Sequence, residues 1–245
     1  MLSKGNEKLN TSERVDPNEG RFTVRLKFRK VGDLQYISHL DLQRTFNRVI
    51  KRSGIPVWYT QGFNPHMKLV FSSPLSIGAQ SVCEYLDLSM QGDISCEEIM
   101  ERLNREVTDE LSIMDAYIPE RKFADIAWAD YTCEIFTVGA SETLAKEAEK
   151  LFCGEPLIMV KNTKAGEKEI DIIPLIKKAN FTFNSETGAI VMKARLSATS
   201  TNFLNPEMLI TAMKDRFDIL STDPTLEWYT IMRESLLDAK EEIFV

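Results

Sequence analysis

The stretch RFTVRLKFRK near the N-terminus constrains the fold more than any other part of this chain. Its apolar residues Phe22, Val24, Leu26 and Phe28 alternate with polar ones. A period of two is typical of a strand with one face in a core and the other face in solvent. We therefore expect ordered structure to begin at Arg21, with a strand whose second face is cationic.

A helix is expected shortly after this strand. Ser38 precedes Asp41 by three positions, as in a capping box that starts a helix, and Gly54 is a typical helix end. Apolar residues between them recur at helical spacing and predict the buried side: Leu42, Phe46, Val49 and Ile50. A basic stripe follows another side of the helix: Arg44, Arg48, Lys51 and Arg52. Strand and helix together predict one basic surface.

The remaining pattern predicts two similar halves. In the first half we expect strands at 69–72, 82–88 and 111–118, with a helix opening at Ser95. The second half loosely repeats the order strand, helix, strand, strand, helix, strand, with an inserted hairpin that turns near Ala165. Its expected elements are strands at 132–138, 179–183, 189–196 and 225–232, and helices at 141–152 and from Asn205-Pro206.

This order predicts an α+β fold of two tandem ferredoxin-like (βαββαβ) units with antiparallel sheets. We place a basic N-terminal domain at 21–120 and an acidic C-terminal domain at 128–245. Residues 1–20 are polar and without periodicity, so we expect a disordered tail there.

Charge is distributed unevenly along the chain. The whole sequence has a formal net charge of −7, yet residues 21–71 hold ten Lys or Arg and only two acids, Asp33 and Asp41, a net charge of +8. Such separation creates a positive field over one region. It favours binding to a polyanion or to an acidic protein surface.

Compartment and cofactors are judged from what the sequence lacks. No apolar run approaches the roughly 18 residues that span a bilayer, and the first residues are not an apolar signal core, so we expect a cytoplasmic protein without membrane contact. The four cysteines match neither a zinc CxxC pair nor an iron–sulfur loop. We therefore expect no cofactor and no metal. A zinc site is the alternative if His39 or His66 meets a cysteine in space.

Four stretches, ISHLDLQR, QGFNPHMK, PLSIG and EYLDL, resemble the start of a bacterial family of radical-SAM-associated (radical-SAM-linked) proteins. In that family this domain of unassigned function occurs alone or fused C-terminal to a radical SAM module. The likeness covers residues 21–87 and extends more faintly to about Leu209. It implies a radical SAM enzyme acting in trans, because this chain lacks the CxxxCxxC loop that ligates such an enzyme's cluster.

Both histidines of the chain fall within these stretches. His66, in a loop between turn residues, is the stronger candidate for proton transfer or phosphate contact, and His39 is the second. Glu84 is a candidate partner for acid–base chemistry. The alternatives are structural, with His39 at a helix start bonded to backbone, and with Glu84 and Asp87 paired across the sheet with Arg25 or Lys27. For Glu84 we favour the pairing.

The basic residues are candidates for RNA contact, because phosphate charge dominates such affinity. The loop from Gln61 to Lys68 would cradle an anion, and Trp58, Tyr59 and Phe63 would stack on unpaired bases. The alternatives are a solvated charged face and a turn whose Phe63 is plugged into the core. The candidate RNA-binding residues are Arg25, Lys27, Arg29, Arg44, Arg48, Arg52, Gly62, Phe63, Asn64 and Lys68.

Three hypotheses of function follow. The first is a non-catalytic recognition module that presents RNA or another anionic substrate to a radical SAM enzyme. The second is an RNA-processing or RNA-modifying enzyme that uses His39 or His66 as proton carrier. The third is a protein-docking scaffold that binds no nucleic acid.

Overall fold

The computed structural model describes residues 20–163 and 166–245. Within them lie four α-helices, a mostly antiparallel sheet of eight strands and a separate two-stranded sheet. The α+β prediction is confirmed. No helix in these residues is long and apolar enough to cross a membrane. The expected disordered tail, apart from Gly20, and the hairpin residue Ala165 lie outside the described residues.

The first half follows the predicted order closely. The Ser38 side chain accepts a hydrogen bond from the Asp41 amide at 3.1 Å, and Gly54 ends the helix with a left-handed φ of 65°. Both predicted helix ends are therefore confirmed. The elements are β1 (Arg21–Lys30), α1 (His39–Ser53), β2 (Leu69–Phe71), β3 (Ala79–Gln91), α2 (Cys96–Asn104) and β4 (Ile113–Tyr117).

The second half has the same order with a hairpin, β6–β7, inserted between its first helix and second long strand. The strand predicted from Thr132 begins earlier, at Ile126. The elements are β5 (Ile126–Phe136), α3 (Glu142–Leu151), β6 (Ile158–Thr163), β7 (Gly166–Asp171), β8 (Ile176–Asn184), β9 (Ala189–Ser197), α4 (Glu207–Phe217) and β10 (Trp228–Asp238).

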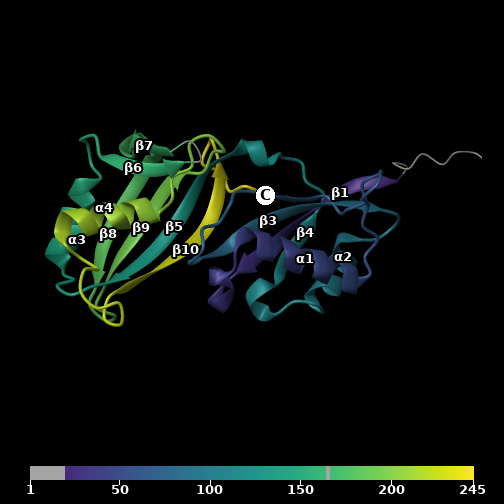
Figure 1. Ribbon diagram of the computed structural model, residues 1–245, viewed down its shortest axis with the longest axis horizontal. Helices are drawn as coiled ribbons and strands as arrows, with labels where there is room; N and C mark the ends of the chain where they lie inside the picture. Colours follow the sequence, from purple (N-terminus) through teal and green to yellow (C-terminus); the bar gives the residue numbers. More distant parts are fainter. Residues whose placement is uncertain (1–19, 164–165) are drawn as a thin grey trace, which may run out of the picture.

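The strands of both halves join in one sheet, with the order β4-β1-β3-β10-β5-β9-β8 and β2 paired to β3 (Figure 1). All neighbours are antiparallel except β3 and β10, which run parallel where residues 79–81 face residues 231–233. The sequence predicted antiparallel sheets in separate units. It gave no sign of this shared parallel joint, because periodicity does not say which strands become neighbours.

The helices of the two halves cover opposite faces of this sheet. On β3, Cys83 and Tyr85 belong to the core under α3 and α4, whereas Leu86 and Leu88 belong to the core under α1 and α2. Successive residues of a strand point to opposite faces. Strand β3 therefore contributes to both cores.

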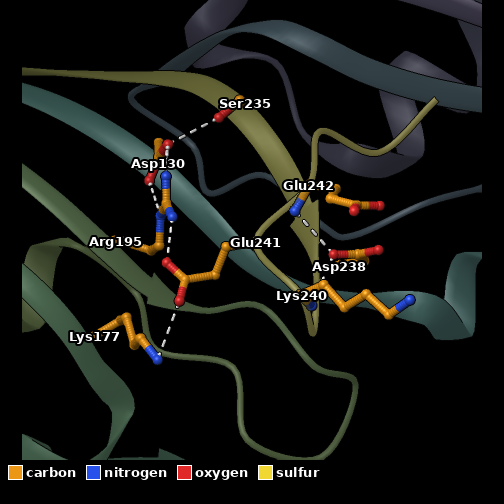
Figure 2. A network of polar contacts seen from close by, with 8 residues as sticks. All are labelled: Asp130, Lys177, Arg195, Ser235, Asp238, Lys240, Glu241 and Glu242. Carbon is orange, nitrogen blue, oxygen red and sulfur yellow. Dashed lines mark hydrogen bonds and ion pairs between the residues drawn. The ribbon is translucent and has the colours of Figure 1, made fainter.

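A polar network lies on the sheet of the second half (Figure 2). Asp130 and Arg195 alternate along their strands with residues of the core under α3 and α4, so they face away from that core. Asp130 accepts hydrogen bonds from Arg195 Nε at 2.7 Å and from Ser235 Oγ at 3.1 Å, and Arg195 also pairs with Glu241, which Lys177 approaches at 3.2 Å. Burial alone would raise the pKa of Asp130, but the Arg195 hydrogen bonds keep it below its ordinary value. These contacts tie four strands to the C-terminal turn, which is a structural role.

One carboxylate fixes the loop between α4 and β10. Glu227 accepts hydrogen bonds from the amides of Val138 at 3.0 Å, Leu220 at 3.2 Å and Thr222 at 2.7 Å. Leu220 has a left-handed φ of 54°, which is unfavourable for a leucine. Hydrogen bonds from Thr137 and Thr222 lower the Glu227 pKa to about 2. The carboxylate thus holds a strained turn in place.

The hydrogen bonds accepted by Glu227 predict that the stability of the protein depends on pH. Because the folded pKa of Glu227 is lowered from 4.5 to about 2, its contribution is fully present above pH 4.5 and is lost as the pH falls towards 2. Glu227→Gln should therefore lower the free energy of unfolding at neutral pH, and the difference from wild type should shrink over that acid range. Urea unfolding across this range measures it. Glu186→Gln, at an exposed position, is the matched control. An equal effect of both changes on the free energy of unfolding would contradict the stabilising role of Glu227.

Candidate functional site

The predicted site residues His39 and Glu84 line one small pocket, called here the His39–Glu84 pocket. Its other polar lining residues are Lys30, Ser38 and Ser73, and its volume is about 10 Å³. That space holds about one water molecule. The end of β1, the start of α1, the segment after β2 and the middle of β3 each supply part of the wall. Three of the four stretches that carry the family resemblance, ISHLDLQR, PLSIG and EYLDL, therefore meet here.

Glu84 is held by an arginine from the other half of the chain. Arg233 on β10 is fully buried, and its Nε donates to Glu84 Oε1 at 3.0 Å. The Nη2 atom of Arg233 also donates to Glu84 and, at 3.1 Å, to the Ser73 carbonyl. Burial opposes the charged form, but the adjacent Glu84 keeps the pKa of Arg233 above its ordinary value. The predicted pairing with Arg25 or Lys27 is therefore wrong for Glu84, whereas for Asp87 it is confirmed, because Asp87 pairs with Arg25 at 2.7 Å.

Lys30 is a pocket residue that the sequence did not single out. It is only 2% exposed, and it follows the apolar residues Val24, Leu26 and Phe28 on the same face of β1. Its Nζ donates to the Gln35 carbonyl at 3.1 Å. Burial lowers the pKa of Lys30, and the charge of Glu84 opposes that shift. The alternation of this strand carried a signal of the burial, because Lys30 is in phase with the apolar residues.

The two histidines occupy different environments. His39 is exposed at the start of α1, with its ring edge-on to Phe71 at 5.0 Å between centroids. The His66 Nδ1 atom lies 3.0 Å from Thr60 Oγ1 and 3.1 Å from the Asn64 carbonyl, within its own loop. His39 thus shares a pocket with Glu84, and His66 does not.

The cysteines do not form a metal site with either histidine in the described part of the chain. No three His, Cys, Asp or Glu side chains there are grouped as metal ligands. All four cysteines are free thiols, and burial raises the pKa of Cys83 and of Cys133 to about 12. Such thiols are inert at neutral pH.

The basic residues of β1 do not form the expected solvated face. Arg25 is only 1% exposed, and its Nε and Nη2 atoms donate to Asp87 at 2.7 and 2.9 Å. Its guanidinium also lies over the rings of Phe123 and Phe244. Arg25 is therefore unavailable to RNA in this structure, because the second face of β1 is covered here by residues from other parts of the chain.

The other predicted cations of β1 are half-buried. Arg29 donates from Nε to the Asp109 carbonyl at 2.5 Å, and Lys27 lies on the same face of the strand as Arg25. The apolar face of β1 packs under α1, so the β1 cations and the exposed side of α1 are on opposite sides of the sheet. The single basic surface expected from strand and helix is not formed.

The cations of α1 do form a continuous exposed set, called here the α1 stripe. Arg44 pairs with Asp41 at 3.2 Å, and Arg52 pairs with Glu106 at 2.8 Å. These are the ion pairs of the stripe within the described residues. Its members are Arg44, Arg48, Lys51 and Arg52.

The loop after α1 presents aromatic side chains unequally. Trp58 is 8% exposed and lies under the Arg21 guanidinium at 3.9 Å, so it is not a stacking platform. Phe63 is fully exposed, which makes the alternative of a core plug wrong, and Tyr59 is 39% exposed. Gly62 next to Phe63 has a φ of 139°, a conformation that favours glycine. The remaining loop candidates, Asn64 and Lys68, are exposed.

The comparisons with known proteins give a family but no activity. Residues 23–206 match a family described as "Uncharacterized protein conserved in bacteria (DUF2344)". No curated protein matches the chain. A solved structure of DyPB from Rhodococcus jostii RHA1 is 11% identical and covers 86% of this chain and 89% of that chain, with a TM-score of 0.20. A likeness this low carries no argument about fold or function.

The pairing of Glu84 with Arg233 predicts a large effect on stability. Glu84→Gln leaves a fully buried guanidinium without its counter-charge, and the expected loss of unfolding free energy is about 3 kcal/mol. Urea unfolding measures it. Glu98→Gln removes an exposed pair with Arg102 and should cost less than about 1 kcal/mol. Equal losses of unfolding free energy in the two variants would show that the buried pair stabilises the fold no more than an exposed pair does.

Proposed function

We propose, from the premise that the chain belongs to the DUF2344 family of uncharacterised proteins conserved in bacteria, that it is a non-catalytic recognition module for RNA. The observation that carries this proposal is the α1 stripe, four exposed cations on one side of one helix. Phosphate charge supplies most of the affinity in such contacts. The RNA backbone would therefore run along α1.

The ion pairs within the α1 stripe do not prevent this use. Arg44 and Asp41 keep side-chain exposures of 60% and 55%, and Arg52 is 59% exposed. Exposed pairs of this kind contribute about 0 to 1 kcal/mol, so a phosphate can replace the carboxylate at little cost. Arg48 and Lys51 add two further exposed cations. The stripe thus supports binding of a polyanion.

The loop after α1 favours RNA over a polyanion without bases as the ligand. Phe63 is fully exposed at the loop, and Tyr59 is partly exposed. Thr60 and His66 are joined by hydrogen bonds through both backbone and side chain, which limits the motion of the segment between them. An exposed aromatic ring on a constrained loop is suited to stack on an unpaired base.

A non-catalytic role is favoured over an RNA-cleaving or RNA-modifying enzyme. Glu84 accepts two hydrogen bonds from Arg233, so its carboxylate is engaged by a structural partner within the fold. His66 contacts its own loop and not the pocket of Glu84 and His39. A general acid and base arranged about one substrate position is the feature that an enzyme would need.

The proposal includes the setting in which the module works. Each half repeats one strand order, β4-β1-β3-β2 and β10-β5-β9-β8, and this supports two ferredoxin-like units. The resemblance to radical-SAM-associated proteins supports a radical SAM enzyme as partner, in the cytoplasm. Capture from a native extract should then enrich a protein with a CxxxCxxC loop, identified by mass spectrometry. Capture of RNA without any such protein would remove the partner from the proposal.

RNA binding is tested by charge reversal in the α1 stripe. Arg48→Glu with Lys51→Glu should weaken binding of single-stranded RNA by at least about tenfold at low salt, because two phosphate contacts become repulsive. The slope of log affinity against log salt should fall in magnitude by about 1.4, since each contact on a single strand contributes about 0.7. Fluorescence anisotropy over a salt series measures both quantities.

The matched control reverses two exposed cations of α3, Lys146→Glu with Lys150→Glu. This pair changes the net charge of the chain equally and lies in the other half, so it should leave RNA affinity nearly unchanged. If both double variants weakened RNA binding equally, the loss of affinity would be due to net charge alone. Absence of RNA binding by the wild type, together with capture of a protein partner, would favour the docking scaffold instead.

A further inference from the structure

The surroundings of the His39–Glu84 pocket hold an excess of buried positive charge, because Lys30 lines the pocket and Arg233 contacts the lining residue Glu84. Arg233, Lys30 and Glu84 are 0%, 2% and 5% exposed, so two cations face one carboxylate at this position. Charges withdrawn from water are normally paired, because an isolated one is costly to bury. The imbalance therefore calls for an anion.

Glu84 makes its close ion pair with Arg233. Both the Nε and Nη2 atoms of Arg233 donate to Glu84 Oε1, while Lys30 makes no ion pair with any residue in the described ranges. Within those ranges Lys30 Nζ donates one hydrogen bond, to the Gln35 carbonyl, and an ammonium has three donors. Burial lowers the pKa of Lys30, and the more distant charge of Glu84 offsets that shift only in part. Lys30 is therefore the buried cation without a close counter-charge.

The space next to Lys30 suits a single oxygen atom. The cavity volume of about 10 Å³ matches about one water, and Ser73 and His39 add a hydroxyl and an imidazole to its lining. Leu42 and Phe71 form apolar walls, which strengthen any polar contact made inside. His39 is exposed, so the pocket opens to solvent beside its ring.

We propose that the His39–Glu84 pocket binds a small oxyanion, a phosphate or a carboxylate group, with Lys30 as its principal donor. One oxygen of the anion enters the cavity beside Lys30, and the remainder of the ligand lies outside near His39 and Ser73. A cation is disfavoured because the carboxylate of Glu84 is already held by Arg233. The site does not use the α1 stripe, so the test of anion binding is independent of the test of RNA binding.

The test is a backbone-amide NMR titration of the full chain with inorganic phosphate and, separately, with acetate at constant ionic strength. Saturable shifts are expected at Lys30, His39 and Ser73. Lys30→Met should weaken the apparent affinity about tenfold or more, as expected for the loss of one charge-assisted hydrogen bond. Saturation by phosphate alone would assign the site to a phosphoryl group, and saturation by both anions would extend it to carboxylates.

The matched control is Lys27→Met, which removes a cation from the same strand on the face opposite α1 and should leave the affinity unchanged. If Lys30→Met does not fold, His39→Ala at its exposed position replaces it and should weaken binding severalfold. Unsaturable shifts in the wild type would overturn the proposal. So would equal weakening by the Lys27 variant, or full affinity in both pocket variants.

Discussion

The contact of Arg233 with Glu84 is the interaction on which the architecture depends. Strands β3 and β10 pair over only three residues each, 79–81 with 231–233, and at the end of that short joint Arg233 reaches Glu84 and the carbonyls of the segment after β2. A guanidinium with no exposure and a carboxylate with little exposure are stable only together. Two halves that each fold from local pattern are thereby fixed as one sheet.

The same joint explains why the N-terminal cations are not one surface. The C-terminal segment returns beneath the first half, where Phe244 accepts a hydrogen bond from the Tyr85 hydroxyl at 2.7 Å and covers the guanidinium of Arg25. Arg25 is thus used to hold the protein together. The cations of α1 stay exposed, and under the proposed function a polyanion would meet positive charge there without displacing a core contact.

Much of the local structure was predictable from the sequence. Alternation in RFTVRLKFRK, the cap at Ser38 and the stop at Gly54 each act over a few residues, and the structure confirms the strand and both helix ends, although not the solvated second face of the strand. The partner of Glu84 was not predictable, because Arg233 lies 149 positions away and nothing in a local pattern distinguishes it from a surface arginine. The burial of Arg25 was missed for the same reason, because Phe123 and Phe244 come from distant parts of the chain. Lys30 was missed although it is in phase with the apolar residues of its strand. Of the candidate site, a grouping of Glu84 with the histidines was the less favoured alternative from the sequence, and the structure brings only His39 to the pocket of Glu84.

The central claim is that RNA lies along α1 and its following loop. Ultraviolet cross-linking of bound RNA, followed by mass spectrometric mapping of the modified peptides, tests it most directly. The account predicts cross-links confined to residues 40–68, with Phe63 and Tyr59 as the reactive aromatic side chains. Cross-links concentrated in residues 128–245, on the acidic half, would contradict it.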